Sequence, residues 1–207
     1  MNESLKDIIG VINTPFTLEN RVDTDSLERY VAHSLKCKVS GFLALGLAAE
    51  VNKLGHEEKR LIAETVVNKT DGKVPVICCT TARSQDERLN LSGGWAGTQM
   101  IEALDRGVDA FMPTILHDVY GMIYHLHNIG KREKAKILFH KLLPIISFSH
   151  QHLDISIHFN KRLVHRQGIF NTAKVREPIL SFHTYHENIA DELITDAISS
   201  SDNINKG

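Results

Sequence analysis

The sequence predicts an α/β protein with parallel strands, followed by a C-terminal region made of helices. Over the first 130 residues, short apolar runs alternate with helical patterns, which is typical of β-α-β units and a parallel sheet. From Lys131 onward no convincing strand pattern occurs, and three further helical patterns follow. The regular alternation breaks near residues 91–95, which separates the first three units from the rest.

The first three units are clear in the apolar periodicity. We expect strands over residues 8–13, 41–45 and 74–80, the first of them ended by Pro15. Asp23 or Thr24 can cap a helix whose apolar residues repeat at i, i+3 and i+4 as far as Leu35. A second helix is expected at about 57–68, and Asp71-Gly72 turns the chain into the third strand.

After the break the pattern resumes once and then becomes helical. We expect a glycine-rich turn over 92–97, a helix over 98–106 and a fourth strand over 108–113. Asp118 can cap the next helix, which ends at Gly130. Helical patterns at 134–143, 155–165 and 179–195 follow, and residues 199–207 are expected to form a polar, frayed end.

Composition limits the classes of function. The 207 residues suffice for one well-buried domain, or a domain with a helical appendix, and the formal net charge of -1 favours neither nucleic acid nor an anionic membrane as partner. Three cysteines, two of them adjacent, argue against a disulfide framework. With no apolar stretch of roughly 20 residues and no signal-peptide pattern, we expect a cytoplasmic protein.

Motifs in chain order carry a family resemblance that covers nearly all of the chain. Each is weak alone, but their order and spacing resemble the dihydrodipicolinate synthase / N-acetylneuraminate lyase family of class I Schiff-base aldolase barrels. The motifs are Gly10, Thr14-Pro15-Phe16, Val22-Asp23, Gly41, Gly46-Leu47-Ala48-Ala49-Glu50, Leu54, Glu57-Glu58, Val74-Pro75-Val76, Gly93-Gly94-Trp95, Gly107-Val108-Asp109-Ala110-Phe111-Met112-Pro113, Leu142-Leu143-Pro144, Lys161 to Gly168, and Val175-Arg176-Glu177-Pro178.

The resemblance implies an incomplete TIM-type (β/α) barrel. A complete barrel needs about 250 residues, and the motifs here match strands one, two, three and eight together with the loop after strand seven. Because strand eight lies beside strand one in a closed barrel, we expect about four parallel strands in the order 8-1-2-3. Residues 1–130 would form this partial barrel, and residues 131–207 would form a C-terminal helical region packed on it.

The missing section is the one that carries the family's chemistry. In the family, those strands hold a proton-shuttling tyrosine, a carboxylate-binding arginine and the lysine that forms the Schiff base, so no catalytic residue is assigned here. A Schiff-base lysine must sit at the C-terminal mouth of a barrel strand, and the strand-like runs contain none. Lys161 lies near an apolar run in the appended helices; like the other lysines, it is expected to be a solvated surface amine.

The exit loop of the second strand is the one element of the family's site that survives. By resemblance its backbone N–H groups bind the carboxylate of a keto acid, so the candidate substrate-binding residues are Ala48, Ala49 and Glu50. The family's threonine hydroxyl relay is lost at these alanines. The alternative is a tight loop kept for its geometry, and Glu50 could hydrogen-bond the loop backbone in either case.

Other constellations give weaker signals. The chain has twelve histidines, six of which form the close pairs His125/His127, His150/His152 and His183/His186, but none has a convincing further ligand, so no metal or cofactor is expected. Cys78-Cys79 fits a buried structural role. Ser92-Gly93-Gly94 precedes a helix and could hold an anion, although the family uses this stretch as a barrel loop.

Two classes of function follow. The first is a carbon–carbon lyase, or aldolase, acting on pyruvate or a related 2-keto acid. The second, favoured by the missing lysine, is a non-catalytic shortened paralogue that binds a keto acid or associates with a full-length relative. Open edges at strands three and eight predict a homodimer in which strand three of one copy pairs with strand eight of the other and closes eight strands. The alternative is that the C-terminal helices cover the open edge.

Overall fold

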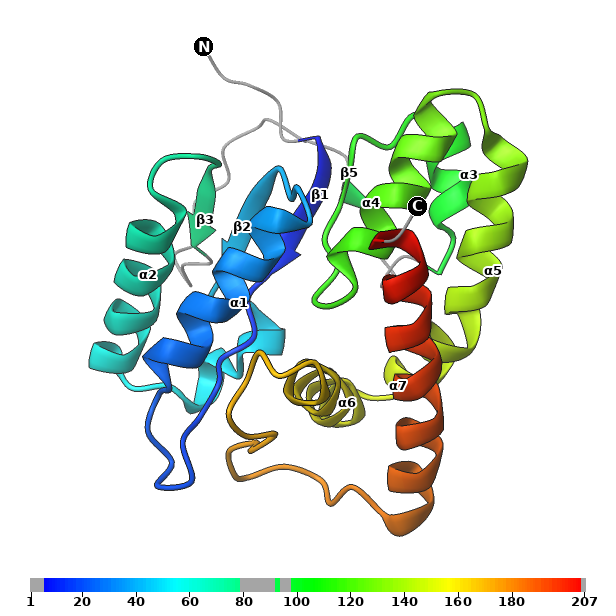
Figure 1. The fold of residues 1–207 in the computed structure, drawn as a ribbon. Helices are drawn as coiled ribbons and strands as arrows, with labels where there is room; N and C mark the ends of the chain where they lie inside the picture. The colour runs from blue at the N-terminus through cyan, green and yellow to red at the C-terminus, as the bar shows by residue number, and fades with distance from the viewer. Residues whose placement is uncertain (1–5, 79–91, 94–97, 206–207) are drawn as a thin grey trace.

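A five-stranded parallel sheet forms one half of the molecule. The computed structural model describes residues 6–78, 92–93 and 98–205 (Figure 1). The strands are β1 (Asp7–Val11), β2 (Gly41–Ala44), β3 (Val76–Cys78), β4 (Ser92–Gly93) and β5 (Ala110–Phe111), in the spatial order β3-β2-β1-β5-β4. The predicted order 8-1-2-3 is confirmed, because β5 occupies the place of strand eight beside β1.

The strand β4 is the element that the sequence did not predict. Ser92 pairs with Ala110 and Gly93 with Phe111 in parallel register, so these two residues extend the sheet beyond β5. The prediction of a turn over 92–97 is therefore wrong for Ser92 and Gly93, and residues 94–97 lie outside the described part. Two residues are too few to show a strand period, and only the pairing with β5 defines the strand.

The helices that follow β1 and β2 begin where the sequence predicts. Helix α1 (Thr24–Lys36) is capped by Asp23, whose carboxylate accepts a hydrogen bond from Ser26 N at 3.0 Å. Helix α2 (His56–Thr70) starts after Gly55, whose N–H donates to the Glu58 carboxylate at 2.9 Å. Between β2 and α2 lie two short 3₁₀ turns, η1 (Leu47–Ala49) and η2 (Val51–Lys53).

Gly10 allows a helix from the second half of the chain to approach β1. A Cβ at this position would lie 3.1 Å from Cε1 of His117, the first residue of helix α4 (His117–Asn128). Helix α3 (Met100–Asp105) precedes β5. The prediction that Asp118 caps α4 is wrong. The N-cap position is Leu116, and the Asp118 carboxylate accepts from Val119 N at 2.9 Å.

The C-terminal region consists of three long helices. They are α5 (Arg132–Ser149), α6 (Leu153–Arg166) and α7 (Thr184–Asn205). The prediction of a frayed end from residue 199 is wrong, since α7 continues to Asn205 and buries Ser201, whose hydroxyl donates to the Asp118 carboxylate. The predicted start at 179 is also wrong, because residues 167–183 form an irregular connection that leads from α6 to α7 (Figure 1).

One hydrophobic core runs through both halves of the chain. Ile12 and Phe16 from the sheet side belong to the same buried cluster as Phe139 and Leu163 from α5 and α6. In Figure 1, α5 and α7 stand beside α4, and α6 lies across the end of the sheet toward which the strands point. Among the described helices none is long and apolar enough to cross a bilayer.

Candidate functional site

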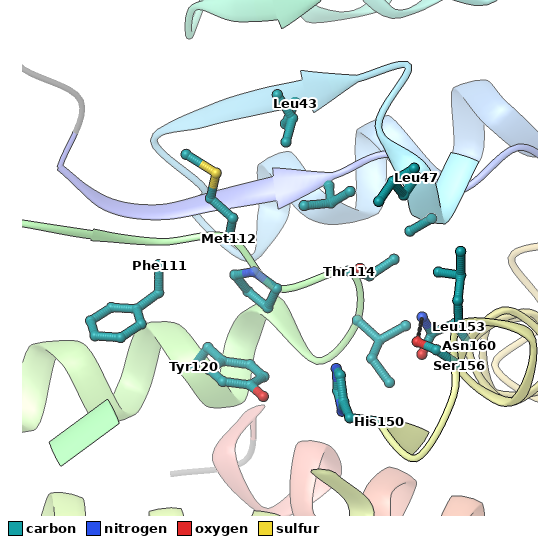
Figure 2. Close-up of a pocket in the computed structure, with 14 residues that line it drawn as sticks. Leu43, Leu47, Phe111, Met112, Thr114, Tyr120, His150, Leu153, Ser156 and Asn160 are labelled. Atoms are coloured by element: carbon teal, nitrogen blue, oxygen red, sulfur yellow. Dashed lines mark hydrogen bonds between the residues drawn. The ribbon is translucent and has the colours of Figure 1, made fainter. Parts of the chain in front are cut away.

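A cavity of about 400 Å³ lies at the C-terminal ends of the parallel strands. Such ends are where β/α proteins place their sites, because the loops that follow several strands meet there. Figure 2 shows apolar side chains of the sheet side facing His150, which follows α5, and the polar side chains Ser156 and Asn160 of α6. The lining residues are Val11, Leu43, Leu47, Ala48, Phe111, Met112, Pro113, Thr114, Ile115, Tyr120, His150, Leu153, Ser156 and Asn160.

The loop after β5 forms one wall of the cavity. Val11 N donates to Pro113 O at 2.9 Å, and the buried Tyr30 hydroxyl donates to the carbonyl of Thr114, so this loop is fixed to β1 and α1. Leu116 then adopts a left-handed conformation, with φ 55°, and starts α4. Tyr120 of α4 lines the cavity, and burial raises the pKa of its hydroxyl, which stays protonated at neutral pH.

The loop after β2 forms a second wall. Ala48 lines the cavity, whereas Ala49 is buried behind it: its N–H donates to Gly46 O at 3.0 Å, and its carbonyl accepts from Thr14 Oγ1 at 2.8 Å. The N–H groups of Leu47 and Ala48 have no acceptor within the part of the chain that the structure describes. Of the three predicted residues, Ala48 is therefore the one that faces the cavity.

The junction of α5 and α6 forms the third wall, and the sequence did not predict it. His150 Nδ1 lies 3.0 Å from Ile146 O, which can only accept, and 2.9 Å from Ser149 Oγ, which can accept or donate. A proton on Nδ1 would serve the Ile146 carbonyl and leave Nε2 as an acceptor. Desolvation of the ring lowers the pKa of His150. Asn160 Nδ2 donates to Ser156 Oγ at 3.3 Å. These contributions depend on the C-terminal helices folding back over the strand ends.

No charged side chain lines the cavity among the described residues. Lysine is absent from the lining, and the two internal segments that the structure does not describe, 79–91 and 94–97, contain no lysine in the sequence. An amine able to attack a ketone is therefore missing from the described walls.

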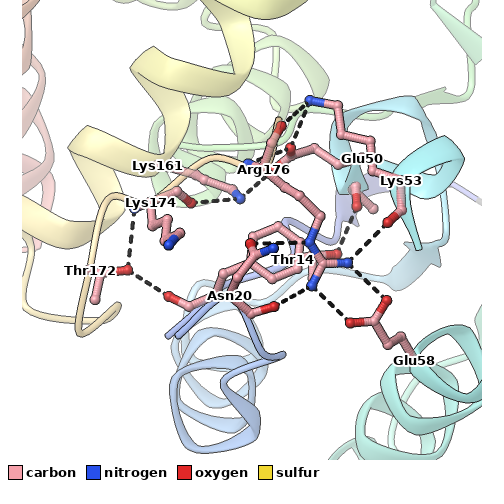
Figure 3. A network of polar contacts seen from close by, with 11 residues as sticks. Thr14, Asn20, Glu50, Lys53, Glu58, Lys161, Thr172, Lys174 and Arg176 are labelled. Atoms are coloured by element: carbon pink, nitrogen blue, oxygen red, sulfur yellow. Dashed lines mark hydrogen bonds and ion pairs between the residues drawn. The ribbon is translucent and has the colours of Figure 1, made fainter. Parts of the chain in front are cut away.

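The prediction that Lys161 is a surface amine is wrong. Its side chain is 0% exposed, and Nζ forms an ion pair with the Glu50 carboxylate, donates to Lys174 O at 3.0 Å and lies 4.2 Å from the centre of the Phe16 ring (Figure 3). Burial lowers the pKa of Lys161 to about 8, and the Glu50 charge opposes that shift. A sequence signal existed, because Lys161 lies four residues after Ile157 and three before Val164, on the buried face of α6.

Glu50 joins the strand-two loop to the C-terminal region. It adopts a left-handed conformation, with φ 55°, which is unfavourable for a residue with a Cβ. Its carboxylate accepts from Lys161, from Lys53 Nζ at 3.1 Å and from Arg176 N at 3.0 Å. The expectation that Glu50 bonds its own loop backbone is therefore wrong; Lys161 and Arg176 hold the loop from distant segments, and Lys53 belongs to η2 of the same connection.

Arg176 extends this network to α2 and to the loop after β1. Its guanidinium donates to both oxygens of Glu58 at 2.8 Å and to Asn20 O at 2.7 Å, and it lies 4.0 Å from the centre of the Phe16 ring. Its hydrogen bonds to the Glu58 carboxylate lower the pKa of that group. The network thus ties the exits of β1 and β2 to the segment that follows α6.

The other predicted constellations do not form a site in the described residues. No group of three histidine, cysteine, aspartate or glutamate side chains there is placed to hold a metal. His183 and His186 meet edge to face, 6.5 Å between ring centres, and His186 stacks on Phe182. Cys78 is a half-buried free thiol; Cys79 and Gly94 lie outside the described residues.

Comparison with known proteins places these features in context. The sequence profile of the "Dihydrodipicolinate synthetase family" matches residues 4–112. The 4-hydroxy-tetrahydrodipicolinate synthase of Staphylococcus saprophyticus is 32% identical over 141 residues, which are 65% of this chain and 44% of that protein. The same enzyme of Staphylococcus carnosus is 33% identical over 140 residues, 62% of this chain and 47% of that protein. The chain thus spans about half the length of these curated relatives.

Solved structures show the same fold at low identity. Dihydrodipicolinate synthase from Oceanobacillus iheyensis superposes with a TM-score of 0.81 at 12% identity, covering 95% of this chain and 97% of that chain. N-acetylneuraminate lyase from Fusobacterium nucleatum superposes with a TM-score of 0.74 at 12% identity, covering 93% and 99%. The fold is that of a β/α barrel, of which the described chain contributes a parallel, open part.

Proposed function

Because the chain belongs to the dihydrodipicolinate synthetase family, we propose that it is a non-catalytic member that binds a small 2-keto acid without forming a Schiff base. The observation that carries this proposal is the cavity at the strand ends, whose described lining has no lysine. The cavity lies at the strand ends, where β/α barrels hold their sites, and its described lining offers no amine of the kind that Schiff-base cleavage of a carbon–carbon bond needs.

The loop after β2 would hold the carboxylate. The N–H groups of Leu47 and Ala48, which have no acceptor among the described residues, are the donors that this role needs, and backbone donors need no particular side chain. Ala49 and Glu50 would not touch the ligand but would fix the conformation of the loop. Ala49 does so through the hydrogen bond that its carbonyl accepts from Thr14, and Glu50 through its ion pairs with Lys161 and Lys53.

Isothermal titration calorimetry with a panel of 2-keto acids tests this proposal. Ala48→Asp places a carboxylate beside the proposed anion position, and we expect it to weaken binding at least about tenfold more than Ala48→Asn, which has nearly the same size and no charge. Equal affinities of the two variants, or a panel in which no 2-keto acid binds, would contradict the proposal.

A carbon–carbon lyase acting on pyruvate or a related acid is the second candidate. Family membership supports it, and Lys161, whose pKa is lowered to about 8, is the buried amine that it would use. Lys161 would first have to leave Glu50 and reach the cavity. A coupled assay for pyruvate release or consumption, run on the unchanged protein and on Lys161→Arg, distinguishes the two candidates: lyase activity that disappears in Lys161→Arg would favour the second.

We propose in addition that two copies associate through the sheet edges. Among the described strands, β3 and β4 are the outer members and each pairs on one side. The predicted open edge at strand eight is wrong, because β5, its equivalent, pairs with β1 on one side and with β4 on the other. The partner of β3 would therefore be β4 of the other copy. Light scattering coupled to size exclusion is expected to give the mass of a dimer, and a monomer at micromolar concentration would contradict this pairing.

A further inference from the structure

The cavity is too large for a three-carbon acid alone. Its volume is about 400 Å³. Roughly 30 Å³ is the share of a whole water molecule in its liquid, so it is an upper bound for a bonded non-hydrogen atom, and the six such atoms of pyruvate would fill at most about 180 Å³. On the same basis the twelve non-hydrogen atoms of phenylpyruvate would need at most about 360 Å³. Half or more of the cavity therefore remains for a side chain beyond the keto-acid group.

The remaining space is bounded mainly by hydrocarbon. Leu43 of β2, Met112 and Ile115 of the loop after β5, and Leu153 of α6 surround it, and no charged side chain lies in the described lining. The polar groups, among them Ser156 and Asn160 of α6, are neutral. A charged or sugar-like extension would lose hydration without gaining enough partners, whereas an apolar one would gain from burial.

We infer that the site selects 2-keto acids with an apolar side chain of four or more carbons over pyruvate. The carboxylate lies at the N–H groups of Leu47 and Ala48, and the apolar side chain extends between Ile115 and Leu153. This inference rests on the proposed function, since it places the keto acid in the same cavity.

Calorimetric titration with pyruvate, 4-methyl-2-oxopentanoate and phenylpyruvate tests the selection. Each additional buried carbon strengthens binding about fourfold, so the three additional carbons of 4-methyl-2-oxopentanoate should give about 60-fold tighter binding than pyruvate. Pyruvate binding as tightly as the larger acids would overturn the inference and leave the proposed function standing. The neutral ketone 4-methyl-2-pentanone binding as tightly as 4-methyl-2-oxopentanoate would overturn the proposed function instead, because the carboxylate would then contribute nothing.

A variant of the apolar wall gives a second test. Leu153 is 44% exposed at the first turn of α6, so Leu153→Ser should fold. We expect it to reduce the preference for 4-methyl-2-oxopentanoate over pyruvate about fivefold, because one apolar contact with the side chain is lost. Leu18→Ser, at an exposed leucine that does not line the cavity, is the matched control and should leave the preference unchanged. An undiminished preference in Leu153→Ser would overturn the inference.

Discussion

At the scale of single residues, the ion pair between Glu50 and Lys161 joins two segments 111 residues apart in the sequence. Both side chains are fully buried, and their charges are compensated by each other and by Lys53 and the N–H of Arg176. Removing one partner of such a pair leaves a buried charge with fewer partners, which costs more than the pair itself contributes.

Lys161→Met should therefore destabilise the protein by about 3 kcal/mol. The double variant Glu50→Gln/Lys161→Met should be less destabilised than the sum of the two single variants, because it removes both charges together. Urea denaturation of the four proteins measures this coupling. Additive free energies would mean that the two side chains do not interact in the folded protein.

His117 makes the free energy of unfolding depend on pH. Its ring is buried, with Nε2 3.1 Å from Pro113 O and Nδ1 3.0 Å from Ser34 Oγ, and burial lowers the pKa of His117 to about 4. Because this lies below the value of about 6.5 expected in the unfolded chain, the unfolded state binds more protons between these two values. The stability that neutral His117 provides is present above pH 6.5 and is lost as the pH falls toward 4.

We expect the free energy of unfolding to fall by up to about 3 kcal/mol on this account between pH 6.5 and pH 4. His117→Gln, which cannot titrate, should show a smaller fall than the unchanged protein. Denaturant titrations at several pH values measure the difference, in which the contributions of the other histidines cancel. The same pH dependence in both proteins would exclude His117 as the cause.

Local features of single residues could be predicted, whereas distant partners could not. The sequence offers Asp23 or Thr24 as the cap of α1, and the structure selects Asp23, whose acceptor role involves Ser26, three residues away. Lys161 was misplaced because lysine is normally exposed, and its partner Glu50 becomes apparent only once α6 lies across the strand ends. The candidate loop was found through its motif, but His150, Ser156 and Asn160 could not be assigned to the cavity without the fold.

At the scale of elements, periodicity predicted the long helices and the first strands well. Helix α2, for example, was expected over 57–68 and spans His56–Thr70. The failures are β4, which is too short for a period, the start of α7, which lies at Thr184 and not at 179, and the end of α7, where a polar composition conceals a packed face. Ala190, Ile194, Ala197 and Ser201 of α7 are all buried and repeat at helical spacing, so the last turns belong to the core side of the helix.

Deleting residues 200–207 should consequently destabilise the protein by about 2 kcal/mol, because the buried Asp118 carboxylate loses the Ser201 hydroxyl. Thermal unfolding followed by circular dichroism measures the loss. Removing only residues 206–207 is the control and should have no effect. A shortened chain as stable as the control would mean that the end of α7 is not packed as described.

At the scale of the whole molecule, the chain is an incomplete TIM-type barrel of the dihydrodipicolinate synthetase family, with a helical C-terminal part. The described strands are neighbours in one sheet. Helix α6 and the network around Glu50 lie over the ends of these strands (Figure 3). The cavity between them keeps a place for a ligand while its described walls contain no amine. Binding without covalent capture is the consequence that we propose.

Borohydride reduction in the presence of pyruvate, followed by intact-mass spectrometry, tests this consequence most directly. A family member that retains the Schiff-base lysine serves as the positive control. The account predicts that the control gains the mass of one reduced pyruvate adduct and that this chain does not. A stoichiometric adduct on this chain, mapped by peptide digestion to Lys161 or to any other lysine, would contradict it.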